Sequence, residues 1–198
     1  MYSWESDHVQ SRQDKREAIL ATALRLFADR GFVGTPTSLI SKEAGVATGT
    51  LFFYFKTKED LIDDLYKRIK AEAAQALCRG LKMEKTGKGK LRRLGNNAVT
   101  WGMRNPEKKK FLEMFAHSPF VSAGAQEEGM SHFIFLKDII HDGIQEGVIR
   151  DMDPALLFCM MAAAINGLVS RASVVKDPME RDRIIAEGLD FVWNGMKT

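Results

Sequence analysis

Four prolines in the chain directly follow a residue that commonly caps the start of a helix. These pairs are Thr35-Pro36, Asn105-Pro106, Asp153-Pro154 and Asp177-Pro178. The side-chain oxygens of Asn, Asp and Thr accept hydrogen bonds from the free amides of a first helical turn. Proline suits the first helical position because that position needs no amide donor. The four pairs therefore predict four helix starts.

Apolar residues recur at spacings of three and four, as at Ile19, Ala23, Leu26 and Phe27. This spacing is typical of one helix face, and the chain has no sustained alternation of period two that would predict strands. We therefore expect an all-α fold of about nine helices. They are predicted near residues 11–30, 36–44, 48–54, 58–82, 89–104, 106–117, 127–146, 154–175 and 178–196. The lysine-rich and glycine-containing segment 82–93 is predicted to be a solvated linker.

The composition is that of a folded globular protein, because 45% of the 198 residues are hydrophobic and 28% are charged. Cys78 and Cys159 form no disulfide framework and lack metal-ligand spacing, which indicates a reducing, cytoplasmic location. Cys159 is predicted to be a small core residue. The first ten residues lack an apolar signal segment. Residues 155–170 are apolar but shorter than the ~20 residues that a membrane span requires, so we predict a buried helix there.

The charge changes along the chain although the net charge is only +3. Residues 1–58 carry 8 basic and 6 acidic side chains, residues 59–110 carry 14 and 7, and residues 111–198 carry 7 and 13. A nucleic acid would therefore meet the N-terminal half, while the acidic C-terminal half favours protein or small-molecule partners.

Residues 37–55 have the spacing of a helix-turn-helix unit. Leu39, Ile40 and Ala44 give a first short helix an apolar face, Gly45 can adopt the positive φ of a tight turn, and a second short helix follows. In such units the second helix lies in the major groove of DNA and presents its N-terminal residues to base edges.

The aromatic residues of this second helix cannot all share one face. Leu51 and Phe55 lie four residues apart on one side, and Phe53 lies most nearly opposite them. Phe52 and Phe53 either pack against the first or fourth helix or face DNA, where thymine methyl groups offer apolar contacts. The sequence leaves both interpretations open.

Residues 16–65 resemble the N-terminal domain of the TetR family of bacterial transcriptional repressors. The matching positions are Ile19-Leu20, Leu26-Phe27, Gly31-Phe32, Ala44-Gly45-Val46, Gly49-Thr50-Leu51, Tyr54-Phe55, Lys58-Glu59, Leu61 and a threonine before the second helix. The resemblance implies a flexible tail at 1–10, a three-helix helix-turn-helix domain at 11–57, and a helical ligand-binding and dimerisation domain at 58–198.

The resemblance also implies which residues meet double-stranded operator DNA. Phosphate contacts are expected from Thr37, Thr50, Tyr54 and Lys58, and base contacts from Ser38, Thr48, Gly49, Phe52 and Phe53. Two positions depart from the family pattern. Ala47 replaces the usual serine, so the helix cap is lost or passes to Thr48 at a cost of about 1 kcal/mol. Phe52 replaces the usual tyrosine and removes a hydroxyl group.

A single unit of this kind contacts little DNA, so we expect a two-fold homodimer. The predicted interface is residues 154–196, because the segment 156–175 is apolar nearly all round and the next helix has an apolar face. The alternative is that these helices form the core of a monomer.

The middle of the chain is rich in aromatic residues and methionine, which could line the cavity of a small-molecule effector. The candidate lining residues are Trp101, Met103, Phe111, Met114, Phe115, His117, Phe135, Met160 and Asn166. Such residues at helical spacing also form ordinary cores. In the family, ligand occupancy tilts the fourth helix and moves the recognition helices.

No catalytic residues are predicted, because the four histidines lack the His-Glu-x-x-His arrangement and the glycines form no phosphate-binding loop. We also predict no metal, no cofactor and no membrane association. The predicted function is a ligand-released transcriptional repressor. The alternative is an all-helical small-molecule or acyl-group binding protein or enzyme whose helix-turn-helix is vestigial.

Overall fold

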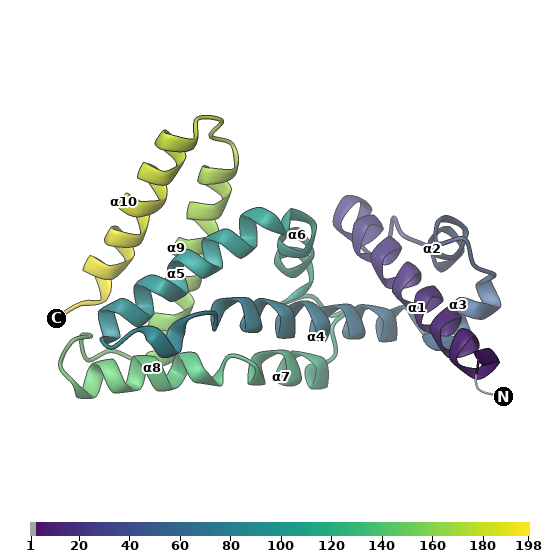
Figure 1. Ribbon diagram of the computed structural model, residues 1–198, viewed down its shortest axis with the longest axis horizontal. Coiled ribbons are helices and arrows are strands. Elements are labelled where there is room, and N and C mark those ends of the chain that lie inside the picture. The colour runs from purple at the N-terminus through teal and green to yellow at the C-terminus, as the bar shows by residue number, and fades with distance from the viewer. Residues whose placement is uncertain (1–2) are drawn as a thin grey trace. The chain divides into compact units, whose positions relative to one another are not determined.

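The computed structural model describes residues 3–198, with side chains from residue 12 onward, and its regular structure is helical (Figure 1). The helices are α1 (Ser3–Arg30), α2 (Thr37–Glu43), α3 (Thr48–Tyr54), α4 (Lys58–Leu77), η1 (Leu81–Met83), α5 (Gly87–Arg104), α6 (Pro106–Phe115), α7 (Ala123–Ser131), α8 (Ile134–Gln145), α9 (Pro154–Ser173) and α10 (Pro178–Met196). No strand occurs in residues 3–198 apart from one isolated bridge between Ile149 and Lys197. The all-α prediction is confirmed.

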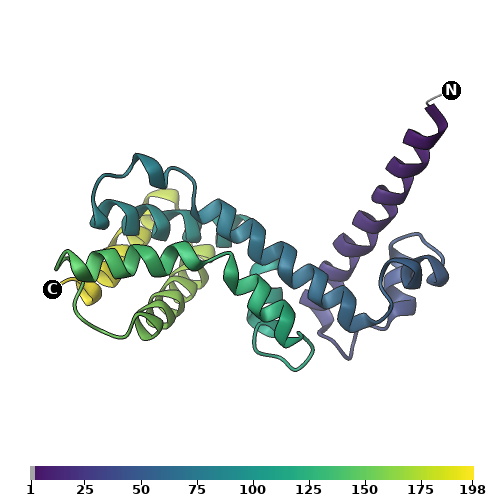
Figure 2. The ribbon, with the colours of Figure 1, turned by 90° about the horizontal axis from the view of Figure 1, so that it is seen from below.

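The first helix is longer than predicted. It runs without interruption from Ser3 to Arg30 (Figure 2), so residues 3–10, predicted as a tail, are helical. Met1 and Tyr2, the remainder of that predicted tail, lie outside the described residues. The apolar spacing on which the prediction rested begins only at Ile19 and therefore carried no information about this first part of the helix.

The contacts divide the chain into two compact units. The first unit comprises residues 1–69 and 107–128, and the second unit comprises residues 70–106 and 129–198. The chain passes between them at three places, within α4, at the start of α6 and within α7. By these contacts α6 belongs with the helix-turn-helix segment. The functional division at residue 57 stays a prediction.

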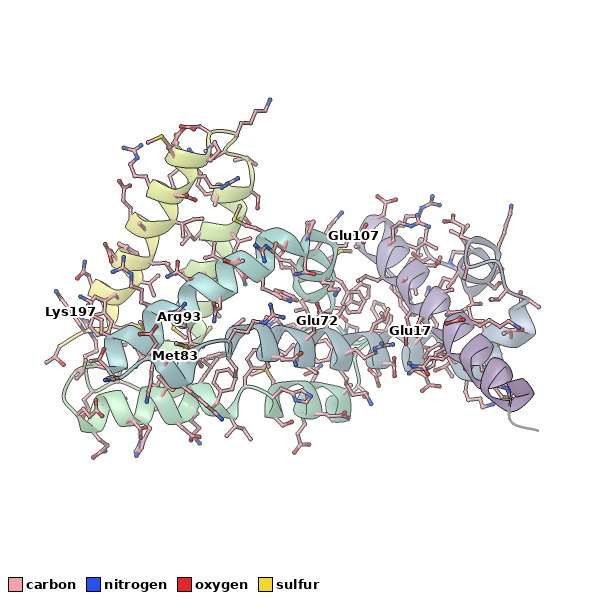
Figure 3. All side chains as sticks on the ribbon, in the orientation of Figure 1. Glu17, Glu72, Met83, Arg93, Glu107 and Lys197 are labelled. Atoms are coloured by element: carbon pink, nitrogen blue, oxygen red, sulfur yellow. The ribbon has the colours of Figure 1, made fainter. Side chains whose placement is uncertain are left out.

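The core of the first unit is built from α1, α2, α3, α4 and α6. Its largest fully buried apolar side chains are Ile19, Leu26, Phe27, Ile40, Leu51, Leu61, Ile62 and Phe111. Ion pairs join α1 to α4: Arg16 bonds Asp64 at 2.6 Å, and Arg68 reaches both carboxylate oxygens of Glu17 at 2.9 Å (Glu17 is labelled in Figure 3). These side chains are partly exposed, so the pairs fix the orientation of the helices more than they stabilise the unit.

The second unit is organised around α5, α9 and α10, and α9 and α10 run antiparallel to each other (Figure 1). Glycines permit close packing here: a Cβ on Gly188 would lie 2.6 Å from the Leu168 side chain, and one on Gly95 would lie 2.6 Å from Leu189. Replacing either glycine would require neighbouring side chains to move.

Two segments differ from the predicted helix boundaries. The single helix predicted over 127–146 is two helices, α7 and α8, because the backbone of Phe133 leaves the helical conformation at φ −106° and ψ 10°. The predicted linker 82–93 is mostly helical. Thr86 caps α5 by accepting a hydrogen bond from the Gly89 amide at 3.0 Å, which lets the helix begin at Gly87. This cap explains why two glycines are accommodated in a first turn.

The prediction of a buried helix at 155–170 is wrong for the isolated chain. In the described part of the chain, α9 is the one helix long and apolar enough to cross a membrane by length and composition, and 22% of its most apolar window is buried. Cys159, predicted to be a core residue, is exposed, and so is Cys78. The apolar character of α9 thus marks an exposed surface.

Candidate nucleic-acid interface

The turn between α2 and α3 is fixed by its backbone. Gly45 adopts φ +67°, a left-handed conformation that suits glycine, and the Val46 amide donates to the Ser41 carbonyl at 3.0 Å. Ile40 and Leu51 are fully buried on either side of the turn, and Phe55 is 4% exposed. These anchors turn the opposite face of α3 toward solvent.

The N-terminus of α3 has no side-chain cap. Its N-cap residue is Ala47, which makes no capping hydrogen bond, and the Thr48 hydroxyl lies 3.0 Å from the Ser41 hydroxyl. Of the two outcomes predicted for the Ala47 departure, the cap is therefore lost. The Ser41 contact instead ties the start of α3 to α2.

The residues predicted to meet bases are exposed, four of them on α3 and Ser38 on α2. Phe53 is 64% exposed and Phe52 is 40% exposed, while Ser38, Thr48 and Gly49 are also exposed. A Cβ on Gly49 would meet no atom of the chain within 4 Å. A large aromatic ring exposed on a polar surface indicates an interaction site. Because most of the Phe53 side chain is exposed, packing against the first or fourth helix does not describe this residue.

The residues predicted to hold phosphates flank this face, and two of them already have partners. Tyr54 donates its phenol hydrogen to the Arg12 carbonyl at 2.8 Å, and Lys58 donates to the Phe32 carbonyl. Burial lowers the pKa of Lys58. Thr37 and Thr50 are half-buried. The phosphate roles of these four residues remain predictions.

Two further lysines, which the sequence did not predict as DNA contacts, lie in or close to α2 and α3. Lys42 lies in the last turn of α2 and Lys56 lies two residues after the end of α3, and both are exposed. Close by, Glu43 accepts a hydrogen bond from Arg25, and this bond raises the pKa of Arg25. Because Arg25 neutralises that carboxylate, the region of α2 and α3 presents positive charge.

The residues predicted to line an effector cavity are divided between the two units. Phe111 and Phe115 are 0% and 2% exposed and pack on Phe27, with ring centres 6.3 and 5.7 Å from its own. They form part of the core of the first unit, which is the alternative that the sequence leaves open for them, and a role in ligand binding stays a prediction. Their spacing three and four residues from apolar neighbours is that of a core helix.

The other candidate lining residues are dispersed. His117 and Asn166 are exposed, and Met114, 42% exposed, lies beside Gly31. Met103 and Phe135 pack against two different apolar clusters of the second unit. Trp101 and Met160 line two different cavities of the second unit.

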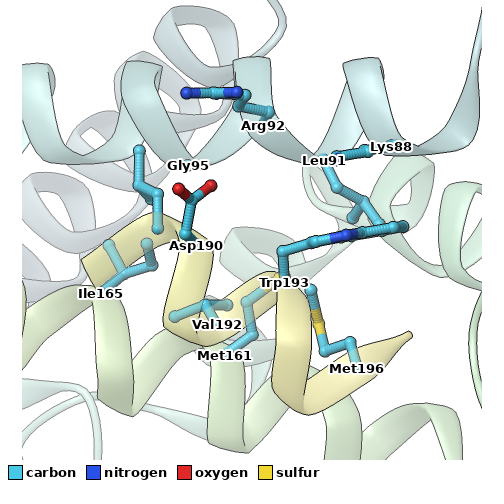
Figure 4. Close-up of a pocket in the computed structure, with 11 residues that line it drawn as sticks. Lys88, Leu91, Arg92, Gly95, Met161, Ile165, Asp190, Val192, Trp193 and Met196 are labelled. Atoms are coloured by element: carbon cyan, nitrogen blue, oxygen red, sulfur yellow. The ribbon is translucent and has the colours of Figure 1, made fainter. Parts of the chain in front are cut away.

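Three hollows lie within the second unit. A slot between α5 and α10, bordered by Lys88, Arg92 and Trp193 (Figure 4), encloses about 30 Å³, which is room for one or two water molecules. An apolar hollow of about 220 Å³ is bordered by Met160 of α9 and Phe191 of α10. A polar cavity of about 150 Å³ lies at the end of α4 and along α5. Among the described residues, no three His, Cys, Asp or Glu side chains are placed to hold a metal ion.

A tight glycine turn between two short helices, the second of which exposes its outer face, defines a helix-turn-helix DNA-binding protein. Comparison with known proteins agrees: the family model described as "Bacterial regulatory proteins, tetR family" matches residues 19–65. The chain belongs to the TetR family of transcriptional regulators, and its resemblance to that family is confirmed.

The similarity extends over nearly the whole chain. A crystal structure from Shewanella sp. PV-4, assigned to the tetR family of transcription regulators, has a TM-score of 0.85 at 30% identity and covers 93% of this chain and 98% of that one. The "Fatty acid metabolism regulator protein" of Bacillus subtilis is 27% identical over 165 residues, or 82% of this chain and 85% of that protein. The transcriptional regulator FadR from Bacillus subtilis, in complex with stearoyl-CoA, shares the fold with a TM-score of 0.73 at 21% identity, covering 90% of this chain and 98% of that one.

Proposed function

We propose that this DNA-binding regulator is a cytoplasmic homodimeric repressor that leaves its operator when a small, largely hydrophobic molecule binds the second unit. The observation that carries the proposal is the exposed outer face of α3, where Phe53 is 64% exposed and its ring meets that of its helix neighbour Tyr54 edge-on, with ring centres 5.2 Å apart. The helical second unit, which does not contribute to that face, supplies the surfaces for dimerisation and for the effector.

The DNA contacts we propose follow the chemistry of each side chain. Hydroxyl groups of Thr37, Thr50 and Tyr54 and the ammonium of Lys58 position the helix on phosphates. On the exposed face, Ser38 and Thr48 supply hydroxyls and the two phenyl rings supply apolar contacts to thymine methyl groups. Since α3 contains no Arg, Lys, Asn or Gln, we expect DNA shape to contribute strongly to sequence preference.

The dimer we propose forms through the exposed apolar face of α9 and α10, within residues 154–196. Leu156, Met160 and Phe191 are 47%, 58% and 76% exposed in the single chain. Met160 and Phe191 border the apolar hollow of about 220 Å³, which a side chain from a second copy would fill. Exposed apolar surface of this extent is unfavourable in water, and a two-fold partner would cover it on both chains at once.

The effector proposal rests on the course of α4 from one unit into the other and on the names of the relatives. Helix α4 starts in the first unit at Lys58 and ends in the second unit at Leu77, so a ligand that shifts its last turns acts on the DNA-binding unit. A ligand needs a difference in affinity between the two states of about 1–3 kcal/mol for a useful switch. The fatty acid regulators among the relatives favour an acyl compound.

The proposal is tested by fluorescence anisotropy with DNA taken from upstream of the protein's own gene. We expect salt-dependent binding that a scrambled duplex does not compete away, and release on addition of a compound from a panel of fatty acids, acyl-CoA thioesters and aromatic drugs. A panel without any effect on DNA affinity would contradict the effector role. Equal affinity for scrambled DNA would contradict operator recognition.

A further inference from the structure

The polar cavity of about 150 Å³ in the second unit is lined by two helices and the residues that follow each of them. Its walls contain donors and charged groups from the end of α4 (Glu72 is labelled in Figure 3) and from α5. The lining residues are Glu72, Ala76, Arg79, Asn97, Thr100, Trp101, Arg104 and Asn105.

Trp101 lines the cavity, and its indole carries an unsatisfied donor. Its indole Nε1 is buried, and within the described part of the chain no acceptor lies at hydrogen-bond distance. Buried donors in native proteins nearly always have a partner, because a donor removed from water without one is costly. An indole nitrogen only donates, so the missing partner is an acceptor.

Arg79 and Arg104 add positive charge at the two ends of the wall. Neither guanidinium has a carboxylate within 4 Å among residues 12–198, whereas Arg93 nearby pairs with Glu84 at 2.7 Å. Glu72 is the one acidic residue of the lining, so the two arginines leave an excess of one positive charge.

Hydrogen bonds fix the backbone that carries both arginines. Asn97 donates both amide hydrogens, to the carbonyls of Leu77 at 2.9 Å and Arg79 at 2.8 Å. Asn105 donates to the Trp101 carbonyl at 2.9 Å and so closes the end of α5 beside Arg104. Both amide hydrogens of Asn97 and one of Asn105 are thereby used within the chain. The donors left for a ligand are the guanidiniums, the indole, the Thr100 hydroxyl and the second amide hydrogen of Asn105.

We propose that this cavity binds the acidic group of a small effector, a carboxylate or a phosphate, through Arg79, Arg104 and the indole N–H of Trp101. Its volume equals that of a cavity that holds a benzene ring, about 150 Å³. The ring of Trp101 and the methyl group of Ala76 supply apolar walls beside the donors. Because Arg79, Thr100 and Arg104 are exposed, a longer apolar tail can extend beyond the cavity.

This inference rests on the proposed function and specifies it: the effector is an acid. The cavity is lined by the two segments through which the chain continues into the DNA-binding unit, the last turns of α4 and the junction at Asn105 before α6. A ligand bound between them contacts both segments at once.

Isothermal titration calorimetry with benzoate, phenyl phosphate and the neutral analogue benzamide tests the site on the full chain. We expect at least one of the two anions to bind once per chain, at least about tenfold more tightly than benzamide. The preferred anion distinguishes a carboxylate from a phosphate. Arg79→Gln and Arg104→Gln should each weaken that binding about tenfold, and Trp101→Phe, which removes the N–H and keeps a ring, about fivefold.

The matched control is Arg92→Gln, an exposed arginine of α5 outside this cavity, which should leave anion binding unchanged. Thermal melts of each variant show that the fold is intact. The proposal is overturned if neither anion binds at about 10 mM, if benzamide binds as well as the anions, or if the Arg79 and Arg104 variants bind normally.

The same titrations on the DNA complex separate this proposal from the proposed function. If an anion binds but leaves DNA affinity unchanged, the site stands and its regulatory role is wrong. If no anion binds while another compound of the panel releases the DNA, the ligand-controlled repressor stands and the acid site is wrong.

Discussion

The ammonium of Lys58 lies 3.8 Å from the centre of the Phe32 ring and donates a hydrogen bond to the carbonyl of the same residue. Phe32 in turn stacks on Phe120, with ring centres 3.8 Å apart and 5° between the planes. These contacts hold the first residue of α4 against the turn that follows α1. An ammonium has three N–H groups, so two remain to meet a DNA phosphate.

Replacing Lys58 by methionine, which keeps the apolar stem, should weaken DNA binding by a similar factor for every sequence. The slope of log affinity against log salt should fall by about one for each lysine lost, because a phosphate contact releases counterions. Anisotropy titrations at several salt concentrations measure this slope. Lys137→Met, an exposed lysine of α8, is the control. An unchanged slope for Lys58→Met would remove Lys58 from the phosphate contacts.

Gly49→Ala tests how closely α3 approaches the DNA. The added methyl group meets no atom of the chain within 4 Å, and alanine favours helix, so thermal stability should stay the same or rise by about 0.4–1 kcal/mol. DNA affinity should fall at least about tenfold, since a displaced helix loses several base contacts. Gly124→Ala in α7, where a methyl group also meets nothing, should leave DNA binding unchanged. Full affinity for Gly49→Ala would place this end of α3 away from the groove.

Phe191→Glu should convert the dimer into monomers. Phe191 is 76% exposed in the single chain, and a carboxylate in its place would be buried without a partner in the proposed interface. Sedimentation velocity measures the change in mass. Phe53→Glu, which also places a charge on an exposed ring position, should remain dimeric. A Phe191→Glu protein that sediments like the unaltered chain would contradict an interface on this face of α10.

Lys70 predicts a pH dependence of the stability of the second unit. Its ammonium lies 4.4 Å from the centre of the Phe133 ring and 3.3 Å from the sulfur of Met130, and burial lowers the pKa of Lys70. Folding therefore favours the neutral amine. The unfolding free energy rises as the pH increases from the lowered pKa toward about 10.4, the value in the unfolded chain.

The substitution Lys70→Met removes this penalty. At pH 7 the melting temperature should rise by about 2–4 °C for each kcal/mol recovered, and the difference from the unaltered chain should shrink as the pH approaches about 10. Calorimetric melts at the two pH values measure both effects. A difference of the same size at both values would show that the charge of Lys70 is not its cause.

The sequence predicted the helix-turn-helix because that unit depends on local signals. The apolar spacing around Ile40 and Leu51 and the glycine of the turn lie within residues 37–55, and the structure has the helices there within one or two residues. The exposure of Phe53, opposite the Leu51 and Phe55 face, is one of the two interpretations that the sequence leaves open. For Phe52, on the flank of the helix, local position did not decide between packing and exposure.

The predictions for the rest of the chain stayed open or failed where tertiary contacts decide. A stripe such as Phe111 and Phe115 has the same spacing whether it borders a ligand or packs on Phe27, and the partner is distant in sequence. Thr35 is predicted from the sequence to cap a helix, but its hydroxyl donates to the carbonyls of Leu26 and Gly31. The sequence did not predict the polar cavity, because Arg79 follows α4 while Trp101 lies in α5, and the two residues share no local motif.

The central claim is that two copies of α3 read DNA through their exposed faces, and selection from a random-sequence DNA library tests it most directly. The account predicts enrichment of an inverted repeat whose half-sites lie about one helical turn or a multiple of it apart, 10–10.5 base pairs per turn. It also predicts that Phe53→Ala protein enriches a repeat with altered bases within each half-site. Enrichment of no sequence, or of the same sequence by the unaltered and Phe53→Ala proteins, would contradict it.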